Sequence, residues 1–100
     1  MSKIANFVKL KAAPEQSGAF KEALIALAAE THKEPGCIMY ELFHGEDNTW
    51  MVAEIWRDAK ALDAHIAAPH TQMVIKLFEK ALAEPPRVET FTPESSTAGN

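Results

Sequence analysis

The sequence predicts a single α+β domain in which helices cover one face of an antiparallel sheet. Apolar residues recur with strand and helix periods in the order strand, helix, strand, strand, helix, strand. The chain has 100 residues, of which 47% are hydrophobic and 24% charged, as in an ordinary globular domain. Right-handed crossovers place both helical layers on the same face of four strands, in the split βαβ arrangement known as ferredoxin-like.

The first strand and the first helix are predicted from these two different periods. Residues 3–11 alternate between two faces, and the more apolar face carries Ile4, Asn6, Val8 and Leu10. Pro14 suits the first turn of a helix. Apolar residues then recur at helical spacing at Phe20, Ala23, Leu24, Leu27 and Ala28. We expect this helix to run to about Thr31 and to be stopped by the turn from Glu34 to Gly36.

A hairpin and a short helix are expected next. Residues 37–44 and 50–56 have the composition of two strands joined by a polar loop. Asp58 is a good N-cap for a short helix that runs through about Ala67. The spacing of apolar residues in that helix turns His65 inward, toward the sheet.

The last helix and strand complete the pattern. Pro69 can open a further helical segment, which ends before Pro85 and Pro86. Its apolar stripe comprises His70, Met73, Val74, Leu77, Phe78 and Ala81. Residues 87–91 form a short strand. We therefore expect one domain over residues 1–92 and a flexible tail over residues 93–100.

One sheet face is left bare by this arrangement. A chain of this size buries only about two thirds of its unfolded surface, so association with a second copy would stabilise the folded state. Residues such as Ile38, Tyr40 and Leu42 are expected on the bare face, with the Tyr40 hydroxyl at its rim. We expect this face to meet its copy across a two-fold axis, as a homodimer joined sheet to sheet.

Composition excludes several classes of function. The formal net charge of -4 provides no basic excess for a phosphate backbone, so we expect no nucleic-acid partner. The single cysteine, Cys37, rules out an internal disulfide and is expected to be a small core residue. Charges interrupt the opening segment, and no stretch approaches the roughly 20 apolar residues of a membrane span. We expect no membrane partner and a cytoplasmic location.

One stretch carries a family resemblance, and it reads EPGCIMYELFHGEDNTWMVAEIWRDAKALDAHIAAPH. It combines a Glu-Pro-Gly-Cys turn, the aromatic Tyr40, the spacing Glu54-x-Trp56, and His65 followed by His70. This pattern resembles the antibiotic biosynthesis monooxygenase superfamily of dimeric α+β barrels, and the resemblance covers residues 3 to 92. The two histidines are most similar to the branch that contains quinol monooxygenases and the autoinducer-2 phosphate-processing enzyme.

The resemblance implies an oxygenase that uses no metal, flavin or haem, because the substrate anion itself reduces dioxygen. Such a site needs a base for a phenolic or enolic hydroxyl, a neutral donor for the oxyanion, and a dry pocket. His65 is the candidate base, since an imidazole changes charge near neutral pH, and Asn6 is the candidate oxyanion donor. The candidate substrate contacts are Trp56, Glu54, Phe43, Tyr40, His70 and Phe78.

Each of these residues also has a structural interpretation. A buried histidine at position 65 could tie the short helix to the third strand through Glu54, and His70 could satisfy the break between helices. Large aromatic residues such as Trp56 belong to the core more often than to a pocket, and a buried Asn6 needs partners. Glu54 is favoured as a structural hydrogen-bonding group; it could instead solvate an edge, form a dimer salt bridge or orient His65.

Haem degradation and metal binding are both disfavoured. Haem-degrading relatives have a tryptophan where this chain has His65, and a histidine near the position of residues 74–76, which are Val-Ile-Lys. The two histidines are separated by Pro69 and lack the i, i+4 spacing of a helical zinc site, and Asp63 lies off their side.

Three hypotheses about function remain. The first is a cofactor-independent monooxygenase that acts on a quinol or polyphenol. The second is an isomerase or tautomerase of a small hydroxyketone, in which the same base moves a proton and oxygen plays no part. The third is a stress-associated dimeric barrel that binds a small apolar ligand without transforming it.

Overall fold

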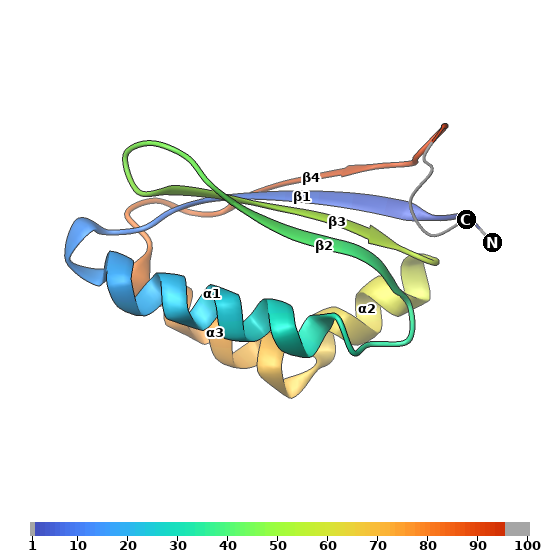
Figure 1. Cartoon of the computed structure of the whole chain (residues 1–100), viewed down its shortest axis with the longest axis horizontal. Helices are drawn as coiled ribbons and strands as arrows, with labels where there is room; N and C mark the ends of the chain where they lie inside the picture. Colours follow the sequence, from blue (N-terminus) through green and yellow to red (C-terminus); the bar gives the residue numbers. More distant parts are fainter. Residues whose placement is uncertain (1, 96–100) are drawn as a thin grey trace.

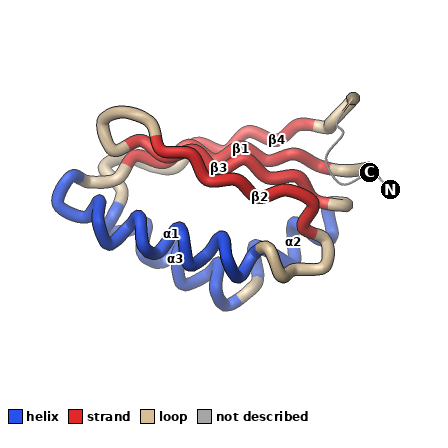
Figure 2. The backbone as a smooth tube through the Cα atoms, in the orientation of Figure 1, coloured by secondary structure: helices blue, strands red, loops and turns tan. Residues whose placement is uncertain are grey.

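The computed structural model describes residues 2–95, in which helices cover one face of an antiparallel sheet (Figure 1). Along the chain the elements are β1 (Ile4–Lys11), a 3-10 turn (Pro14–Gln16), α1 (Ser17–Thr31), β2 (Cys37–His44), β3 (Thr49–Trp56), α2 (Ala59–Ala67), α3 (Pro69–Ala81) and β4 (Arg87–Phe91). The four strands lie in the order β2-β3-β1-β4, and every neighbouring pair is antiparallel. Figure 2 shows the helices together on one side of the strands. The predicted α+β ferredoxin-like fold is therefore confirmed.

The core lies between the sheet and the helices. Alternate residues of the central strands β1 and β3 face the helical layer, where they pack against the apolar stripes of α1 and α3. The buried set includes Leu10, Trp50, Val52 and Trp56 from the sheet and Phe20, Leu24, Leu27, Leu62, Val74 and Ala81 from the helices. Phe20 and Trp56 are fully buried, so this layer has the close packing of a domain core.

A β-bulge at Ile38 sets which side chains of β2 face the helices. From Trp56 to Ile55 β3 advances one residue, whereas β2 advances two residues from Cys37 to Met39. The extra residue on β2 reverses the alternation of that strand relative to its neighbour. Every side chain of β2 beyond the bulge therefore lies on the face opposite to the one that simple alternation from Cys37 would give.

The expectation that Tyr40 and Leu42 lie on the bare face is wrong. Tyr40 is paired with Glu54, which faces the helices, and only 5% of Tyr40 is exposed. Leu42 packs against the same core. The exposed aromatic of this strand is instead Phe43, which is 55% exposed on the opposite face of the sheet. The bulge is the physical reason, because it shifts the register by one residue.

Local features of the chain fix where α2 begins, where it ends and where α3 begins. Asp58 caps α2, and its side chain accepts a 2.8 Å hydrogen bond from the backbone nitrogen of Ala61. Ala68 has an extended backbone (φ -64, ψ 143), which ends α2, and Pro69 then opens α3. The residue before a proline is sterically biased toward this extended conformation.

The turn between α1 and β2 lies against the start of α2. Its backbone is held by a hydrogen bond from the Glu34 nitrogen to the Thr31 oxygen (3.0 Å) and by one from the Arg57 nitrogen to the Gly36 oxygen (2.9 Å). A Cβ atom added at Gly36 would overlap the Cβ of Ala61. Glycine is therefore required here by the close approach of the turn to the helix.

The described residues include no helix that is both long enough and apolar enough to cross a membrane. Of the predicted tail, residues 96–100 lie outside the part of the chain that the structure describes.

Replacing Gly36 by alanine should force the turn away from α2 and lower the free energy of unfolding by about 1–3 kcal/mol, the usual cost of overpacking. Urea unfolding measures this change. Gly18→Ala in α1 is the matched control, because a Cβ there meets nothing within 4 Å. That change should be neutral or stabilising by up to about 1 kcal/mol. Equal destabilisation by both changes would contradict the proposed close approach.

Candidate functional site

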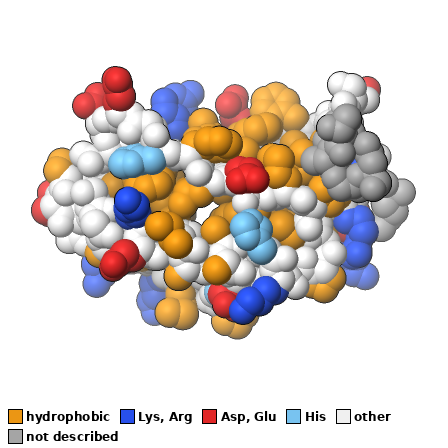
Figure 3. All heavy atoms as spheres, viewed as in Figure 1, with side chains coloured by type: hydrophobic (Ala, Val, Ile, Leu, Met, Phe, Trp, Pro, Cys, Tyr) orange, Lys and Arg blue, Asp and Glu red, His pale blue; other side chains and the backbone are white. Residues whose placement is uncertain are grey.

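A cavity of about 270 Å³ lies between the sheet and the helices. Figure 3 shows hydrophobic side chains gathered between these two layers. Apolar side chains from the three α-helices and from β1, β3 and β4 make up most of its wall, and the polar groups come from Asn6, Tyr40, Glu54, His65 and Thr71. Ile66, Ile75 and Val88 line the cavity and are themselves between 39% and 56% exposed, so it opens between the helices and β4.

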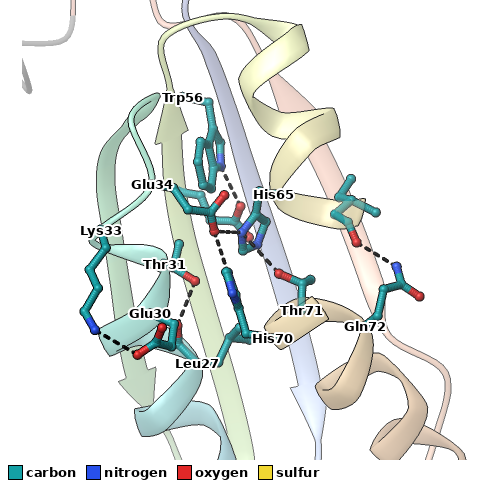
Figure 4. Close-up of polar contacts among 12 residues, drawn as sticks. Leu27, Glu30, Thr31, Lys33, Glu34, Trp56, His65, His70, Thr71 and Gln72 are labelled. Carbon is teal, nitrogen blue, oxygen red and sulfur yellow. Dashed lines mark hydrogen bonds and ion pairs between the residues drawn. The ribbon is translucent and has the colours of Figure 1, made fainter. Parts of the chain in front are cut away.

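His65 is the central residue of the polar part of this wall. It comes from α2 and is 4% exposed, and its Nδ1 donates a 2.8 Å hydrogen bond to Oε2 of Glu34 (Figure 4). Its ring lies against Trp56, with 4.6 Å between centroids, and meets Tyr40 edge-on at 5.6 Å. Thr71 Oγ1 lies 3.3 Å from the same nitrogen. These contacts hold the imidazole with Nδ1 turned toward Glu34.

The bond to Glu34 selects the tautomer of His65. A carboxylate only accepts hydrogen bonds, so the proton of the neutral ring lies on Nδ1. The other nitrogen, Nε2, then carries a lone pair and makes no hydrogen bond to any described residue. Because His65 lines the cavity, Nε2 is the nitrogen available to a ligand there.

Glu34 also binds a second histidine. His70, in the first turn of α3, donates from Nε2 to the same carboxylate oxygen at 2.8 Å. Figure 4 shows both rings turned toward Glu34 from different helices. The Glu34 and His70 side chains are 15% and 27% exposed, so this cluster lies at the edge of the core. The contact of Glu34 with both histidines was not predicted from the sequence, which assigned this residue only to the turn.

A second set of polar residues, Asn6 and Glu54, lies on neighbouring strands at the cavity. Asn6 on β1 is paired with Glu54 on β3, and both are buried, at 6% and 3% exposure. Glu54 accepts a 2.7 Å hydrogen bond from Trp56 Nε1, and Asn6 Oδ1 accepts one of 2.8 Å from Thr90 Oγ1. Because its oxygen accepts from Thr90, the Asn6 amide has its nitrogen as donor; one of the two N–H groups bonds to Glu54, and the other can donate to a ligand. His65 is oriented by Glu34 and not by Glu54.

Burial raises the pKa of three titratable residues near the cavity. Burial raises the pKa of Glu54 above its ordinary value, against the opposing effects of hydrogen bonds from Trp56 and Asn6 and of the nearby His65. Burial likewise raises the pKa of Tyr40. Desolvation, with the charges of Glu34 and Glu54, raises the pKa of Cys37 to about 11. The thiol is therefore a poor nucleophile at neutral pH.

The structure brings together some of the predicted site residues and separates others. Of the predicted residues, the cavity is lined by Asn6, Tyr40, Glu54, His65 and Phe78. Trp56 lies behind His65 and not on the cavity wall, and His70 contacts Glu34 outside it. The prediction that Phe43 contributes to the pocket is wrong, because the bulge at Ile38 places its side chain on the far face of the sheet.

This arrangement pairs a hydrogen-bonded base with a donor amide in an otherwise apolar chamber. Nε2 of His65 can accept a proton, and Glu34 can stabilise the charged ring that results. The Asn6 nitrogen can donate to an oxygen atom, and apolar walls exclude water. The site is therefore suited to removing a proton from a small apolar molecule that carries a hydroxyl group.

Comparison with known proteins gives a family match. Residues 4–77 match the model of a family described as antibiotic biosynthesis monooxygenase. The chain is 32% identical over 77 residues to the uncharacterized protein sll1783 of Synechocystis, a match that covers 71% of this chain and 52% of that protein. It therefore spans about half the length of this relative. It is 30% identical over 81 residues to a Bacillus subtilis protein named "Putative monooxygenase YcnE", covering 79% of this chain and 83% of YcnE.

Solved structures share the fold. Rv0793 from Mycobacterium tuberculosis superposes with a TM-score of 0.91 at 24% identity, covering 97% of this chain and all of that one. A conserved protein from Methanosarcina mazei superposes with a TM-score of 0.86 at 26% identity, covering 94% of this chain and 95% of that one.

The raised pKa of Glu54 predicts a pH-dependent stability. Between the unfolded value near 4.3 and the higher folded value, the folded state binds more protons than the unfolded state, so stability falls as pH rises. Glu54→Gln keeps an acceptor for Trp56 and removes this titration. Its free energy of unfolding relative to wild type should therefore increase from about pH 4 toward neutral pH, as measured by urea unfolding at several pH values.

The control for Glu54→Gln is Glu41→Gln, which removes a carboxylate from an exposed position on β2. A relative stability of Glu54→Gln that stays constant or falls over this pH range would contradict the assigned direction.

Proposed function

Because the chain belongs to the antibiotic biosynthesis monooxygenase family, we propose that it oxidises a small quinol with dioxygen and requires no metal, flavin or haem. The observation that supports this most directly is the apolar cavity in which His65 and Asn6 present a proton acceptor and a donor amide.

The dimensions and walls of the cavity favour a single-ring substrate. Its volume of about 270 Å³ lies just below the range of about 300–1,000 Å³ that is usual for ligand sites. Polar groups adjoin one another where the register aligns Asn6, Glu54 and Tyr40, and the remaining wall is apolar, with Phe78 among its residues. A hydroquinone meets both conditions, because it combines an aromatic ring with hydroxyl groups.

His65 and Asn6 have distinct parts in the proposed reaction. Nε2 of His65 takes a proton from a phenolic hydroxyl, while Glu34 stabilises the imidazolium. The Asn6 amide donates to the phenolate oxygen. The electron-rich phenolate then transfers an electron to dioxygen within the dry cavity, and the resulting radicals combine at a ring carbon.

The overall reaction balances without an outside reductant. One oxygen atom replaces a ring hydrogen and the other leaves as water, so that hydroquinone and dioxygen give hydroxybenzoquinone and water. The substrate supplies all four electrons that dioxygen takes up. Uncatalysed autoxidation, in contrast, transfers two electrons and yields a quinone and hydrogen peroxide.

His65→Ala should lower the rate of quinol oxidation by about 10²–10⁴-fold, the usual contribution of a general base. Oxygen uptake is measured with chelator-treated protein and a panel of hydroquinones, and labelled dioxygen identifies the oxygen atom in the product. His44→Ala is the control, since His44 stacks on Trp50 and does not line the cavity. It should retain full activity.

Three results would contradict the proposal. Oxygen uptake no faster than autoxidation for every hydroquinone would exclude this substrate class. Peroxide in equal amount to oxygen consumed would exclude oxygen insertion. Turnover of a hydroxyketone under anaerobic conditions, without quinol oxidation, would instead support the isomerase.

We also propose that the protein is a homodimer joined through the outer face of its sheet. Paired residues of neighbouring strands lie on the same face, and the outer one carries Ala5, Phe7, Met39, Phe43, Met51, Ala53, Ile55 and Phe91. Phe7 and Phe91 pack edge to face, with 5.7 Å between ring centroids, and Phe43 and Phe91 are more than half exposed. The same face also carries Lys9, Glu41, Arg87 and Glu89, which are charges of both signs. An apolar patch accompanied by charges that can pair across a two-fold axis favours burial against an identical copy.

Phe43→Glu should weaken this dimer by at least about 2 kcal/mol, or roughly thirtyfold in Kd, because it introduces a charge into an apolar interface. Sedimentation velocity over a range of concentrations measures the association. Met73→Glu is the control, since Met73 is 75% exposed on α3, away from the sheet. A monomeric wild type, or equal dissociation by both changes, would overturn the proposed interface.

A further inference from the structure

We propose that Glu34, His65 and His70 form a binding site for a divalent transition-metal ion such as Zn²⁺ or Co²⁺. One ligand atom from each residue lies within 4.8 Å of the others. Two imidazole nitrogens and a carboxylate oxygen are a donor set that suits zinc and its neighbours in the first transition row.

Two of the three distances between ligand atoms are already close to those around a coordinated ion. Oε2 of Glu34 lies 2.8 Å from Nδ1 of His65 and 2.8 Å from Nε2 of His70. Ligands at about 2.0–2.1 Å from a tetrahedral ion lie about 3.3 Å apart. The two oxygen–nitrogen distances therefore need to lengthen by about half an ångström, and the two histidine nitrogens, which lie within 4.8 Å of each other, need to settle at about 3.3 Å. The ion then replaces the two N–H hydrogen bonds.

Surrounding contacts hold the three ligands in place. The ring of His65 is packed between Trp56 and Tyr40, and the backbone turn that carries Glu34 is hydrogen-bonded to the end of α1. His70 is the most exposed of the three, at 27% of its side chain, so an ion and a coordinated water can reach the cluster past it. Metal sites gain affinity when their ligands are oriented in advance in this way.

An ion at this cluster has a consequence that rests on the proposed quinol oxidation. Metal bound to Nδ1 of His65 displaces the proton from that nitrogen, so the neutral ring carries its proton on Nε2. Nε2 then has no lone pair for a substrate hydroxyl. The ion at this position is therefore an inhibitor of the oxygenase and not its cofactor.

The binding step is tested without substrate, on tag-free protein treated with a chelator. Isothermal titration calorimetry with Zn²⁺ should give one site per chain. Paramagnetic Co²⁺ should broaden the NMR signals of His65 and His70 first. His70→Gln retains an N–H donor for Glu34 but lacks the imidazole ligand, so it should preserve the fold and raise Kd by at least about tenfold. His44→Gln removes an imidazole outside the cluster and should leave Kd unchanged.

The absence of stoichiometric binding, or an unchanged Kd in His70→Gln, would overturn the site. A loss of binding in His44→Gln equal to that in His70→Gln would also overturn it, because it would indicate coordination elsewhere. Protein that binds the ion but oxidises no quinol would leave the site established and exclude only the proposed function.

The inhibition is tested separately by quinol oxidation at increasing Zn²⁺. Wild type should lose activity over the concentration range in which it binds the ion, and His70→Gln should need at least about tenfold more Zn²⁺ for the same loss. Activity that is unchanged or increased by bound Zn²⁺ would overturn the inhibitory part of the proposal.

Discussion

The shared carboxylate of Glu34 is the interaction on which the rest of the site depends. It accepts hydrogen bonds from two imidazoles that belong to different helices, and it thereby joins the turn after α1 to both α2 and α3. A buried Nδ1 left without this partner would cost about 1–3 kcal/mol. The same bond orients the His65 ring and leaves Nε2 as its acceptor. Oε2 of Glu34 therefore both joins three segments of the chain and selects the tautomer of His65.

The cavity is the second constraint, because small domains rarely leave space unfilled. Protein cores contain few voids larger than a water molecule, yet about 270 Å³ is kept beside His65 and Asn6. Large side chains such as Phe20 and Trp56 are fully buried in the neighbouring core. The space is therefore a feature of how the layers are arranged and not of loose packing throughout, as expected for a chamber that receives a ligand.

Periodicity was sufficient to predict the order of the elements, because each strand or helix repeats its apolar residues at its own spacing. It also grouped Asn6 with Ile4, Val8 and Leu10 on one face of the first strand, but only the structure showed that this face is turned to the helices. It did not predict the bulge at Ile38, since a single extra residue leaves no mark on composition. Without the bulge, Tyr40 and Phe43 were each assigned to the wrong face of the sheet.

The sequence by itself determined the ferredoxin-like order of elements, the family pattern and the inward direction of His65, all of which depend on residues close together in the chain. Only the tertiary structure decided what His65 contacts. Glu34 is 31 residues away in sequence, and it reaches the ring because the turn packs against α2 at Gly36. Contacts of this kind depend on how distant segments pack, and local spacing carries no information about that packing.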